Sequence, residues 1–414
     1  MSYRVMSGEL EKHVGASIRL CGWVHRRREL ARVTFLVVRD RAGLAQVVVP
    51  PGLPVPGEES VVEVTGTVVA NDVAPGGFEV AYEAIEVLSE AEPPPVELFR
   101  PAVDAGLPAL LDHAAVTLRH PARRAVFAAS AAAVKAFRVT LDGLGFTEIQ
   151  TPKIVGTATE SGANVFALDY FGRRAYLAQS PQFYKQTMVG VFERVYEVGP
   201  VFRAEPHDTS RHLATYTSLD AELGFVRDHR DVMAVLTRVV RAMSAAATAG
   251  LPGAEPVRMP DEVPVVHFAE ALRLVGADPA EPDLAPEHER ALGAWALAEH
   301  GSDFVYVEGY PMAKRPFYTH PQPSDPRWSN SFDLLFRGME LVTGGQRRHR
   351  YADYVEALGP QAEGLSGYLA AFRHGMPPHG GFAIGLERFL ARLTGAANVR
   401  ETTLFPRDLH RLAP

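Results

Sequence analysis

Cysteine is almost absent from this chain, since Cys21 is the single one among 414 residues. One thiol cannot form an internal disulfide, and the cysteine-rich zinc sites are excluded as well. Cys21 lies in an apolar run, where we expect a small core residue rather than a nucleophile. The scarcity of cysteine fits a cytoplasmic protein.

Long apolar runs are missing too. No stretch approaches the roughly 18 consecutive apolar residues of a membrane span, and the N-terminal segment has no apolar core typical of a signal peptide. Apolar residues make up 47% of the chain and charged residues 22%, which is typical of a globular protein. We therefore expect a soluble, cytoplasmic protein of two or three domains with no contact to a membrane.

An overall excess of basic residues is also lacking, because the net charge at pH 7 is −7. This charge weighs against indiscriminate binding of nucleic acid. The distribution is uneven, however. Residues 1–50 carry nine Lys and Arg against four Asp and Glu, whereas residues 51–92 carry nine acids and no Lys or Arg. The first fifty residues are the part that we expect to attract a polyanion.

The first ninety residues contain five short runs rich in Val, Ile, Leu and Phe, at 17–25, 32–39, 44–49, 61–69 and 78–87. Turn-forming residues separate them, so the pattern predicts five strands and a small barrel of the OB type, a common oligonucleotide binder. The basic segment HRRREL, residues 25–30, is expected as a loop, with Phe35 and Gln46 on the next two strands. Arginines beside an aromatic ring suit single-stranded bases. A solvated loop and a core phenylalanine are the alternative.

A proline-rich segment, residues 91–108, follows the barrel and fits a semi-rigid linker. Three parts are therefore expected along the chain. They are a barrel domain at 1–92, a linker or hinge at 93–120 and a larger domain at 121–414.

Both helical and strand-like patterns occur in the larger domain. Residues 121–144, 176–188 and 229–249 are predicted to be helices. The segment FTEIQTPKIV is strand-like, with Pro152 interrupting it. Residues 250–330 are mixed and contain many prolines, so no element is assigned there.

Two alternating runs between residues 195 and 225 flank a polar loop, which predicts a hairpin. Arg203 and Glu205 share one face of the first run, and the loop adds Arg211 and His212, donors suited to phosphate. The second run has a polar face and an apolar face: Tyr216, Ser218, Asp220 and Glu222 alternate with Leu219, Ala221 and Leu223. The polar face is either the solvated outside of a sheet or the floor of a site for an anionic ligand with a planar ring.

A second hairpin is predicted at residues 332–350, around an Arg-Gly turn. This register places Leu335 opposite Glu340 and Asp333 diagonally beside Glu340. Two such carboxylates could share Mg²⁺, which prefers one or two carboxylates plus phosphate oxygens, although paired acids at a hairpin are often only solvated. The glycines of TGGQR allow close approach of a ligand, and Arg347 can fork onto a carboxylate.

Near the C-terminus, GFAIGLERFLARL predicts a glycine-flanked strand that runs into a helix. The apolar residues at helical spacing form a stripe that we expect to be buried: Leu386, Phe389, Leu390 and Leu393. Glu387 and Arg388 fall off this stripe. An arginine at a strand-to-helix junction behind three glycines suits a phosphate contact, and a surface salt bridge is the alternative.

The order of these motifs resembles that of the class II aminoacyl-tRNA synthetases. GFTEIQTPKIV is similar to motif 1, FRAE…RHL…YTSLDAEL to motif 2 and GFAIGLER to motif 3. With an OB-like domain in front, the resemblance is to subclass IIb, and LAQSPQFYKQ, TGGQRRHR and LFPRD resemble its archaeal-type aspartyl branch. The resemblance implies an α+β fold: an OB-fold anticodon-binding domain, then an antiparallel sheet flanked by helices, and a homodimer formed through motif 1.

By this resemblance the protein would use ATP and Mg²⁺ to join L-aspartate to tRNA(Asp). The implied ATP-binding residues are Arg203, Glu205, Arg211, His212, Tyr216, Glu340 and Arg388, among which Arg203, Glu205 and Arg388 are the catalytic ones. Arg203 would bind the α-phosphate, and Tyr216 would stack on adenine opposite Arg388. Asp333 and Glu340 would carry Mg²⁺.

The resemblance also implies an aspartate site, made of Glu160, Ser180, Gln182, Lys185, Asp220 and Arg347. Gln182, Ser180 and Asp220 would fix the α-amino group, and Lys185 and Arg347 would hold the side-chain carboxylate. We expect these two cations to reject asparagine, because the amide would bury donors against them and leave both charges uncompensated.

Anticodon recognition is implied for the barrel, where Phe35, Gln46 and Glu79 match base-contacting positions and Arg26 lies nearby in sequence. Aspartate-restricted members of the family tend to have Trp after GWV and Lys ahead of GFE, and here those positions are His25 and Pro75. This pattern resembles the non-discriminating members, which charge both tRNA(Asp) and tRNA(Asn). Aspartyl-tRNA(Asn) would then need a tRNA-dependent amidotransferase as partner.

Three alternatives stay open. An asparaginyl-tRNA synthetase shares the architecture and the three motifs, although His207 and the segment RPFYTH, residues 315–320, favour aspartate. An asparagine-forming ligase with the same catalytic domain would not need the OB-like domain. A catalytically silent tRNA-binding paralogue would not need the arginines of the three motifs.

Overall fold

The computed structural model describes residues 4–157, 164–206 and 208–412. Its chain divides into two compact units, Met1–Arg124 and Ala125–Pro414. Glu160 and His207, two of the positions named above, lie outside the described residues. The domain boundaries expected at residues 92 and 120 stay predictions.

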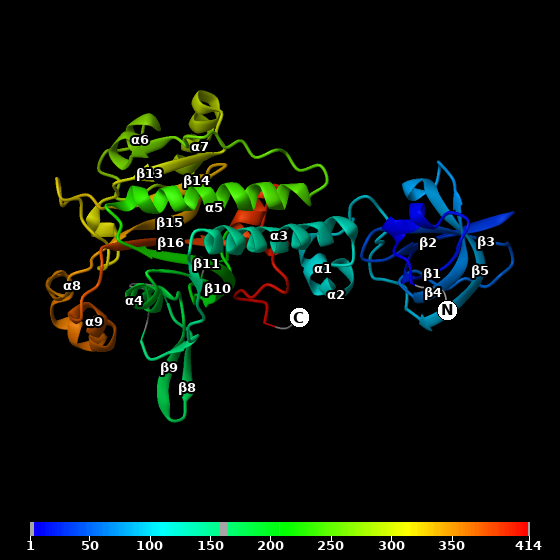
Figure 1. Cartoon of the computed structure of the whole chain (residues 1–414), viewed down its shortest axis with the longest axis horizontal. Helices are drawn as coiled ribbons and strands as arrows, with labels where there is room; N and C mark the ends of the chain where they lie inside the picture. The colour runs from blue at the N-terminus through cyan, green and yellow to red at the C-terminus, as the bar shows by residue number, and fades with distance from the viewer. Residues whose placement is uncertain (1–3, 158–163, 207, 413–414) are drawn as a thin grey trace. The chain divides into compact units, whose positions relative to one another are not determined.

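A closed five-stranded barrel forms most of the first unit (Figure 1). Its strands are β1 (Ser17–Leu30), β2 (Val33–Arg39), β3 (Leu44–Val49), β4 (Val61–Ala70) and β5 (Phe78–Ser89), in the order β1-β2-β3-β5-β4. Apolar side chains at every second position fill its interior, where Leu20, Leu36, Val47, Val64 and Val80 are fully buried. Short 3-10 helices lie at Ser7–His13 and Pro75–Gly77. The predicted five-stranded barrel is confirmed.

Strand β1 is longer than the sequence predicted. The segment HRRREL, expected as a loop, continues the strand: past a bulge after Val24, residues 26–30 pair with residues 37–33 of β2. The loop prediction was wrong because arginine side chains on an exposed ribbon keep their hydration. Charged side chains therefore do not end a strand as long as its backbone N–H and C=O groups can pair with a neighbouring strand.

Residues 90–106 form neither helix nor strand, as expected of a proline-rich linker. Two short helices follow, α1 (Leu107–Asp112) and α2 (Ala114–Thr117). Arg119, just after them, pairs with the buried carboxylate of Glu59 at 3.1 Å. The last part of the expected linker is therefore fastened to the barrel.

An eight-stranded sheet lies at the centre of the second unit, in the order β12-β13-β14-β15-β16-β11-β10-β6. Its strands are β6 (Thr147–Glu148), β10 (Arg194–Phe202), β11 (Thr215–Gly224), β12 (Val265–His267), β13 (Phe304–Glu308), β14 (Ser331–Phe336), β15 (Met339–Arg347) and β16 (His379–Gly385). The two outermost pairs, β6 with β10 and β12 with β13, are parallel, and the other pairs are antiparallel. The prediction of an antiparallel sheet therefore holds for the centre and is wrong at both edges.

A smaller three-stranded sheet holds β7 (Ile154–Val155), β9 (Arg173–Leu177) and β8 (Ala167–Tyr170), in this order. The strand-like segment FTEIQTPKIV is split between the two sheets, because β6 and β7 lie on either side of Pro152. Proline lacks a backbone N–H and cannot continue a central strand, as the sequence indicated.

Two long helices, α3 (Pro121–Gly143) and α5 (His229–Ala249), lie along the large sheet (Figure 1). Their apolar stripes share one core cluster with inward-facing side chains of β11 and β15. Helix α5 is long and apolar enough by composition to cross a membrane, but Val232, Leu236 and Val239 are fully buried in this core. Core packing accounts for its apolar character. The helices predicted at 121–144 and 229–249 are confirmed.

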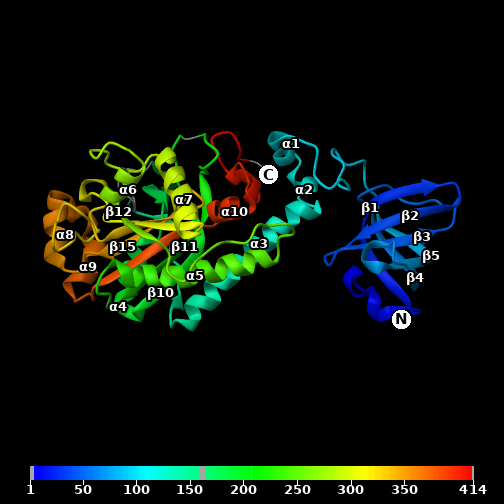
Figure 2. The ribbon, with the colours of Figure 1, turned by 90° about the horizontal axis from the view of Figure 1, so that it is seen from above.

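Helix α4 (Gln182–Phe192) begins six residues later than the helix predicted at 176–188. The first part of that prediction is wrong: residues up to Leu177 belong to β9, and Pro181 caps the helix, as suits a residue without an N–H. Helices α8 (Tyr351–Leu358) and α9 (Ser366–Arg373) lie beside one another near α4 (Figure 2), and α4, α8 and α9 share an aromatic cluster. A further 3-10 helix lies at Gly359–Leu365.

The region left unassigned, residues 250–330, forms one end of the sheet and its cover. It contains β12, α6 (Phe268–Leu274), α7 (Pro286–His300), β13 and a 3-10 helix at Met312–Lys314. Helices α6 and α7 pack in a separate apolar cluster with β13. The chain then reaches the second predicted hairpin, β14 and β15, in which Leu335 lies opposite Glu340 as predicted. After β16 come α10 (Leu386–Thr394) and a 3-10 helix at Val399–Thr402.

Candidate active site

The polar face of β11 is buried rather than solvated. Leu219, Ala221 and Leu223 point into the core, and the alternate positions point to the opposite side of the sheet. There Asp220 and Glu222 are 2% and 0% exposed. The interpretation as a solvated outer face is therefore wrong, and this strand forms the floor of a site.

Seven expected ATP-binding residues line one cavity of about 610 Å³. The cavity lies over β11, β15 and β16, and these residues are Arg203, Glu205, Arg211, His212, Tyr216, Glu340 and Arg388. They come from three segments that are far apart in the sequence. The first hairpin, the second hairpin and the strand-to-helix junction, which the sequence indicated separately, therefore meet in the structure.

Tyr216 lies among cations in this cavity. The Arg203 guanidinium carbon lies 5.7 Å from the centroid of the Tyr216 ring, within range of a cation–π contact. A Cβ placed on Gly385 would lie 4.0 Å from the Tyr216 ring and 3.8 Å from Arg388 Cβ. A flat ring bound here would have an aromatic face and guanidinium groups around it.

Glu289, on α7, lies beside the cavity lining, and no sequence pattern indicated it. Its Oε2 accepts from Arg211 Nη1 at 3.3 Å and from the backbone N–H of Glu340 at 3.1 Å. The side chain is 10% exposed. Glu289 therefore connects the loop of the first hairpin, 78 residues before it in the sequence, to the strand that carries Glu340, 51 residues after it.

The two carboxylates of the second hairpin lie beside arginines. Arg315 Nη2 is 3.2 Å from both oxygens of Asp333, and Arg388 Nη1 is 3.4 Å from Glu340 Oε1. Desolvation by the surrounding protein raises the pKa of Glu340, and repulsion from Asp333 adds to this, although 41% of its side chain is open to the cavity. Asp333 is 4% exposed. A pair of crowded carboxylates that repel each other suits a divalent cation.

Within the described residues, no group of three or more His, Cys, Asp and Glu side chains is placed to hold a metal ion. Asp333 and Glu340 alone would leave most positions of an octahedral Mg²⁺ ion to other oxygens. The pair therefore fits a metal that arrives with phosphate oxygens and water rather than one held by protein alone.

Glu387 falls off the apolar stripe of α10, as the sequence indicated, and is nevertheless buried. It is 8% exposed and lines the cavity, and its two oxygens accept from the backbone N–H of Thr217 at 2.9 and 3.1 Å. Burial raises the pKa of Glu387. The predicted stripe of Leu386, Phe389, Leu390 and Leu393 is confirmed as buried. The stripe argument missed Glu387 because it considers apolar residues alone.

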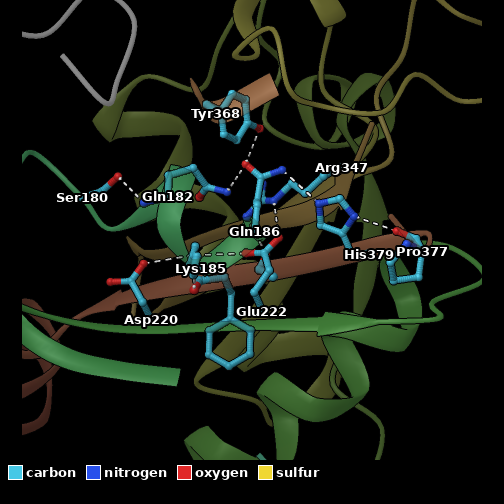
Figure 3. A network of polar contacts seen from close by, with 12 residues as sticks. Ser180, Gln182, Lys185, Gln186, Asp220, Glu222, Arg347, Tyr368, Pro377 and His379 are labelled. Atoms are coloured by element: carbon cyan, nitrogen blue, oxygen red, sulfur yellow. Dashed lines mark hydrogen bonds and ion pairs between the residues drawn. The ribbon is translucent and has the colours of Figure 1, made fainter. Parts of the chain in front are cut away.

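Next to this cavity lies a buried group of charges (Figure 3). Lys185 Nζ lies 3.0 Å from Asp220 Oδ1, 3.3 Å from Glu222 Oε2 and 3.2 Å from the carbonyl oxygen of Phe382. The contacts to Asp220 and Phe382 are hydrogen bonds, and the contact to Glu222 Oε2 is an ion pair. Lys185 is 1% exposed, so its charge is held and compensated by the protein itself.

Arg347 pairs with the other oxygen of the Glu222 carboxylate. Its Nε donates to Glu222 Oε1 at 2.9 Å and its Nη2 to the Gly381 carbonyl at 3.0 Å. Burial would lower the pKa of Arg347, but Glu222 outweighs burial and raises it. A Cβ on Gly381 would overlap the Glu222 carboxylate, so glycine is required where the two strands meet here.

Of the two cations, Arg347 is the one that has N–H groups available for a ligand within the described part of the chain. A guanidinium has five N–H groups, and within the described part of the chain the oxygens of Glu222 and Gly381 take two of them. The argument that bound asparagine would leave the charges of Lys185 and Arg347 uncompensated therefore does not hold. Asp220 and Glu222 already balance both charges, because burying unpaired cations would cost far more than a ligand could return.

Ser180 and Gln182 lie at the start of α4, on the same side as Lys185 (Figure 3). Ser180 Oγ accepts from the backbone N–H of Gln182 at 3.2 Å, and Gln182 Nε2 donates to Gln186 Oε1 at 2.9 Å. The described members of the expected aspartate site are thus brought together. Gln186, one turn after Gln182, was missed, although its i,i+4 spacing could have indicated it.

Comparison with known proteins agrees with this geometry. Residues 108–409 match the family of class II tRNA synthetases (D, K and N), and residues 18–88 match the OB-fold nucleic acid binding domain. An aspartate–tRNA(Asp/Asn) ligase of Thermus thermophilus is 49% identical over 99% of this chain and 100% of its own length. One of Deinococcus radiodurans is 48% identical over 99% of both chains. The chain belongs to the class II tRNA synthetases.

Solved structures of this family have the same fold. The asparaginyl-tRNA synthetase of Pyrococcus horikoshii, complexed with asparaginyl-adenylate, is 29% identical and covers 100% of both chains with a TM-score of 0.90. The aspartyl-tRNA synthetase of Entamoeba histolytica is 27% identical and covers 100% of this chain and 93% of its own, with a TM-score of 0.87. The synthetase described here is thus an aminoacyl-tRNA ligase, and ATP is the nucleotide that its family uses.

The barrel of this synthetase presents a polar and aromatic outer face. Phe35 and Gln46 alternate with buried neighbours on β2 and β3, and Glu79 precedes the fully buried Val80 on β5, so their side chains share the outside. Gln46 Nε2 donates to Glu79 Oε2 at 2.9 Å, and Arg28 lies 6.0 Å from the Phe35 ring centroid. The alternative of a core position for Phe35 is wrong.

Of the other expected anticodon residues, Arg26 lies on the same side of β1 as Arg28, whereas Pro75 and His25 have different surroundings. Arg26 lies 4.7 Å from the ring centroid of Phe99, and Pro75 is exposed in a 3-10 helix. His25 is 7% exposed, and its Nδ1 lies 3.1 Å from Arg39 Nη1. Burial and the Arg39 charge lower the pKa of His25 to about 4. In this conformation His25 can act on a base only through its neighbours.

Proposed function

We propose that this synthetase activates L-aspartate with ATP and transfers it to both tRNA(Asp) and tRNA(Asn). The observation that carries the proposal is an arginine-lined cavity together with the buried Arg347, of whose five N–H groups the described residues accept two. The names of the aspartate–tRNA(Asp/Asn) ligases, 48% and 49% identical over nearly the whole chain, support the choice of substrates.

In the proposed reaction ATP lies in the cavity. Tyr216 faces adenine, with Arg388 on the other side and Glu205 at its amino group or at the tRNA acceptor end. Arg203 meets the α-phosphate, and Arg211 and His212 meet the β- and γ-phosphates. The aspartate α-carboxylate attacks the α-phosphorus in line, so no covalent nucleophile of the protein is needed. These arginines stabilise the charge that develops on the phosphoryl oxygens.

Asp333 and Glu340 would hold Mg²⁺ together with phosphate oxygens of ATP, and the ion would neutralise charge on the leaving pyrophosphate. Arg315 would remain paired with the outer side of Asp333. Because Glu340 lines the cavity that also holds the arginines proposed to bind phosphate, and Asp333 is close enough to repel it, metal and nucleotide would bind together.

Recognition of the aspartate side chain falls mainly to Arg347 in this proposal. Its spare N–H groups match a carboxylate, whereas an asparagine amide would turn two N–H donors toward them. Lys185 would act on the substrate only indirectly, because it is already paired with Asp220 and Glu222. Asp220 and Gln182 offer oxygens to the α-ammonium group, with Ser180 beside them. Glu160, outside the described residues, is proposed to close over the amino acid.

The choice of tRNA would follow from the barrel. Phe35, Gln46 and Glu79 would contact anticodon bases, and His25 and Pro75 stand where aspartate-restricted members carry a large ring and a cation. Loss of both near the third anticodon base removes what could distinguish C from U. We propose that aspartyl-tRNA(Asn) is passed to an amidotransferase, that the protein acts as a homodimer, and that it works in the cytoplasm.

Aspartate-dependent exchange between ATP and pyrophosphate tests the amino-acid assignment. The unmodified protein is expected to support exchange with L-aspartate and not with L-asparagine. Arg347→Lys is expected to raise KM for aspartate by about tenfold or more, since lysine lacks the planar fork. Arg373→Lys, on the nearby helix α9 and outside the cavity, is the matched control. Exchange with asparagine alone would contradict the proposal.

A further inference from the structure

Three side chains form a continuous buried chain behind the aspartate site (Figure 3). Gln182 Nε2 donates to Gln186 Oε1 at 2.9 Å, and Gln186 Nε2 lies 3.0 Å from His379 Nε2. At the far end His379 Nδ1 lies 2.9 Å from the carbonyl oxygen of Pro377. Gln182, Gln186 and His379 are 4%, 0% and 0% exposed.

The direction of every hydrogen bond in this chain follows from its far end. A carbonyl oxygen can only accept, so His379 Nδ1 must carry a proton. Burial lowers the pKa of His379 to about 4, so at neutral pH the ring has no second proton and Nε2 is an acceptor. Gln186 must then turn its NH₂ group to His379 and its Oε1 to Gln182. Gln182 in turn must present its own NH₂ group to Gln186.

Two tyrosines pack around Gln186 without deciding its orientation. Gln186 Nε2 donates to Tyr354 Oη at 3.0 Å, and Tyr368 Oη donates to Gln186 Oε1 at 3.0 Å. A phenol oxygen can either donate or accept, so both tyrosines could serve a reversed Gln186 equally well. His379 is the member of this network that has a single possible role.

We propose that His379, acting through Gln186, is a positioning residue that keeps Gln182 Oε1 turned toward the aspartate site. This oxygen then accepts from the α-ammonium group of the amino acid, opposite Asp220. If the Gln182 amide were rotated by 180°, its NH₂ group would face the ammonium group. The accepting oxygen would then be replaced by two N–H donors, which repel the ammonium group. The inference rests on the proposed function, because it concerns the amino group of the same substrate.

The test compares L-aspartate with succinate, which is aspartate without its amino group. In Gln186→Met the acceptor for Gln182 is lost while the side chain keeps its length. KM for aspartate in pyrophosphate exchange is expected to rise about tenfold, the loss expected for one hydrogen bond to a charged group. Inhibition by succinate is expected to stay nearly unchanged. A loosened pocket would weaken both ligands together, and that result would overturn the inference.

Gln186→Glu is the conservative variant. Whether the carboxyl group donates to His379 as an acid or accepts from a protonated His379, its other oxygen still faces Gln182. The ratio of KM for aspartate to the inhibition constant of succinate is therefore expected to return toward that of the unmodified protein. A ratio as high as in Gln186→Met would contradict the proposed role of Gln186.

His379→Phe keeps a flat ring beside Phe372 and removes the acceptor. It is expected to lose the same selectivity as Gln186→Met, and the double variant is expected to lose no more than either single one, because both act through Gln182. Additive losses would overturn the inference. Absence of aspartate-dependent exchange in the unmodified protein would instead contradict the proposed function.

Discussion

Glu222 and Arg347 form a buried ion pair, with Arg347 Nε donating to Glu222 Oε1 at 2.9 Å. Glu222 has no exposed surface, and its second oxygen lies 3.3 Å from Lys185 Nζ. Burial would raise the pKa of Glu222, but the charges of Arg347 and Lys185 outweigh burial and lower it. Glu222 is therefore an ionised carboxylate that two cations share, and it fixes the direction in which Arg347 points.

Replacing Glu222 by Gln should both destabilise the second unit and weaken aspartate binding. One partner of a buried charge group would be lost, which costs about 3–5 kcal/mol, and Arg347 would lose its fixed direction. Urea unfolding and KM for aspartate measure the two effects. Glu97→Gln is the matched control, because its pair with Arg100 is more than half exposed and contributes about 1 kcal/mol or less. Equal stability of the two variants would contradict this account of Glu222.

Glu289 should influence ATP rather than aspartate. It holds Arg211 while the remaining N–H groups of Arg211 stay available for phosphates. Glu289→Gln removes the charge but keeps an oxygen for the Glu340 N–H. KM for ATP is expected to rise about fivefold, which corresponds to about 1 kcal/mol, with KM for aspartate nearly unchanged. Glu287→Gln, exposed on the same helix, is the control. A fall in KM for ATP would mean that Glu289 competes with the phosphates for Arg211.

Glu308 should make the second unit sensitive to acid. Burial would raise the pKa of Glu308, but hydrogen bonds from His229 and Arg230 outweigh burial and lower it from 4.5 to about 2. Because the folded-state pKa is the lower one, the stabilisation is complete above pH 4.5 and is lost as the pH falls toward 2. It amounts to about 3 kcal/mol at pH 7.

The variant Glu308→Gln tests whether the stabilisation by Glu308 is lost as the pH falls. Its free energy of unfolding in urea should lie below that of the unmodified protein at pH 7, and the gap should narrow as the pH falls below 4.5. A gap that stays constant from pH 7 to pH 4 would show that Glu308 keeps the same protonation in both states.

His25 and Pro75 should set the choice between the two tRNAs. The double variant His25→Trp with Pro75→Lys is expected to lower kcat/KM for tRNA(Asn) relative to tRNA(Asp) by about tenfold, since one base discrimination is worth about 1–3 kcal/mol. His113→Trp, an exposed histidine of the same unit outside the barrel strands, is the control. An unchanged ratio would show that the buried His25 has no influence on base recognition.

The features that could be predicted from the sequence are those that depend on residues close together in the chain. Alternation along β11 predicted which side chains leave the core, and the Arg-Gly turn fixed the pairing of Leu335 with Glu340. Both follow from the two-residue period of a strand and the geometry of a tight turn. The set of ATP-binding residues that lines the cavity was named from the resemblance to the class II synthetases.

The residues that the sequence missed act across long separations. Glu289 and Arg315 come from the region 250–330, and no local pattern shows that they reach Arg211 and Asp333. Glu222 was visible as a member of the polar face, but its role depends on Lys185 and Arg347, which lie 37 residues before it and 125 after it in the chain. Such contacts depend on how helices and strands pack in the folded protein rather than on spacing along the sequence.

Parallel aminoacylation of purified tRNA(Asp) and tRNA(Asn) transcripts tests the central claim most directly. The account predicts that L-aspartate is attached to both tRNAs at similar rates and that L-asparagine is attached to neither. Attachment of aspartate to tRNA(Asp) alone would contradict the argument from His25 and Pro75, and attachment of asparagine alone would contradict the assignment of the amino acid.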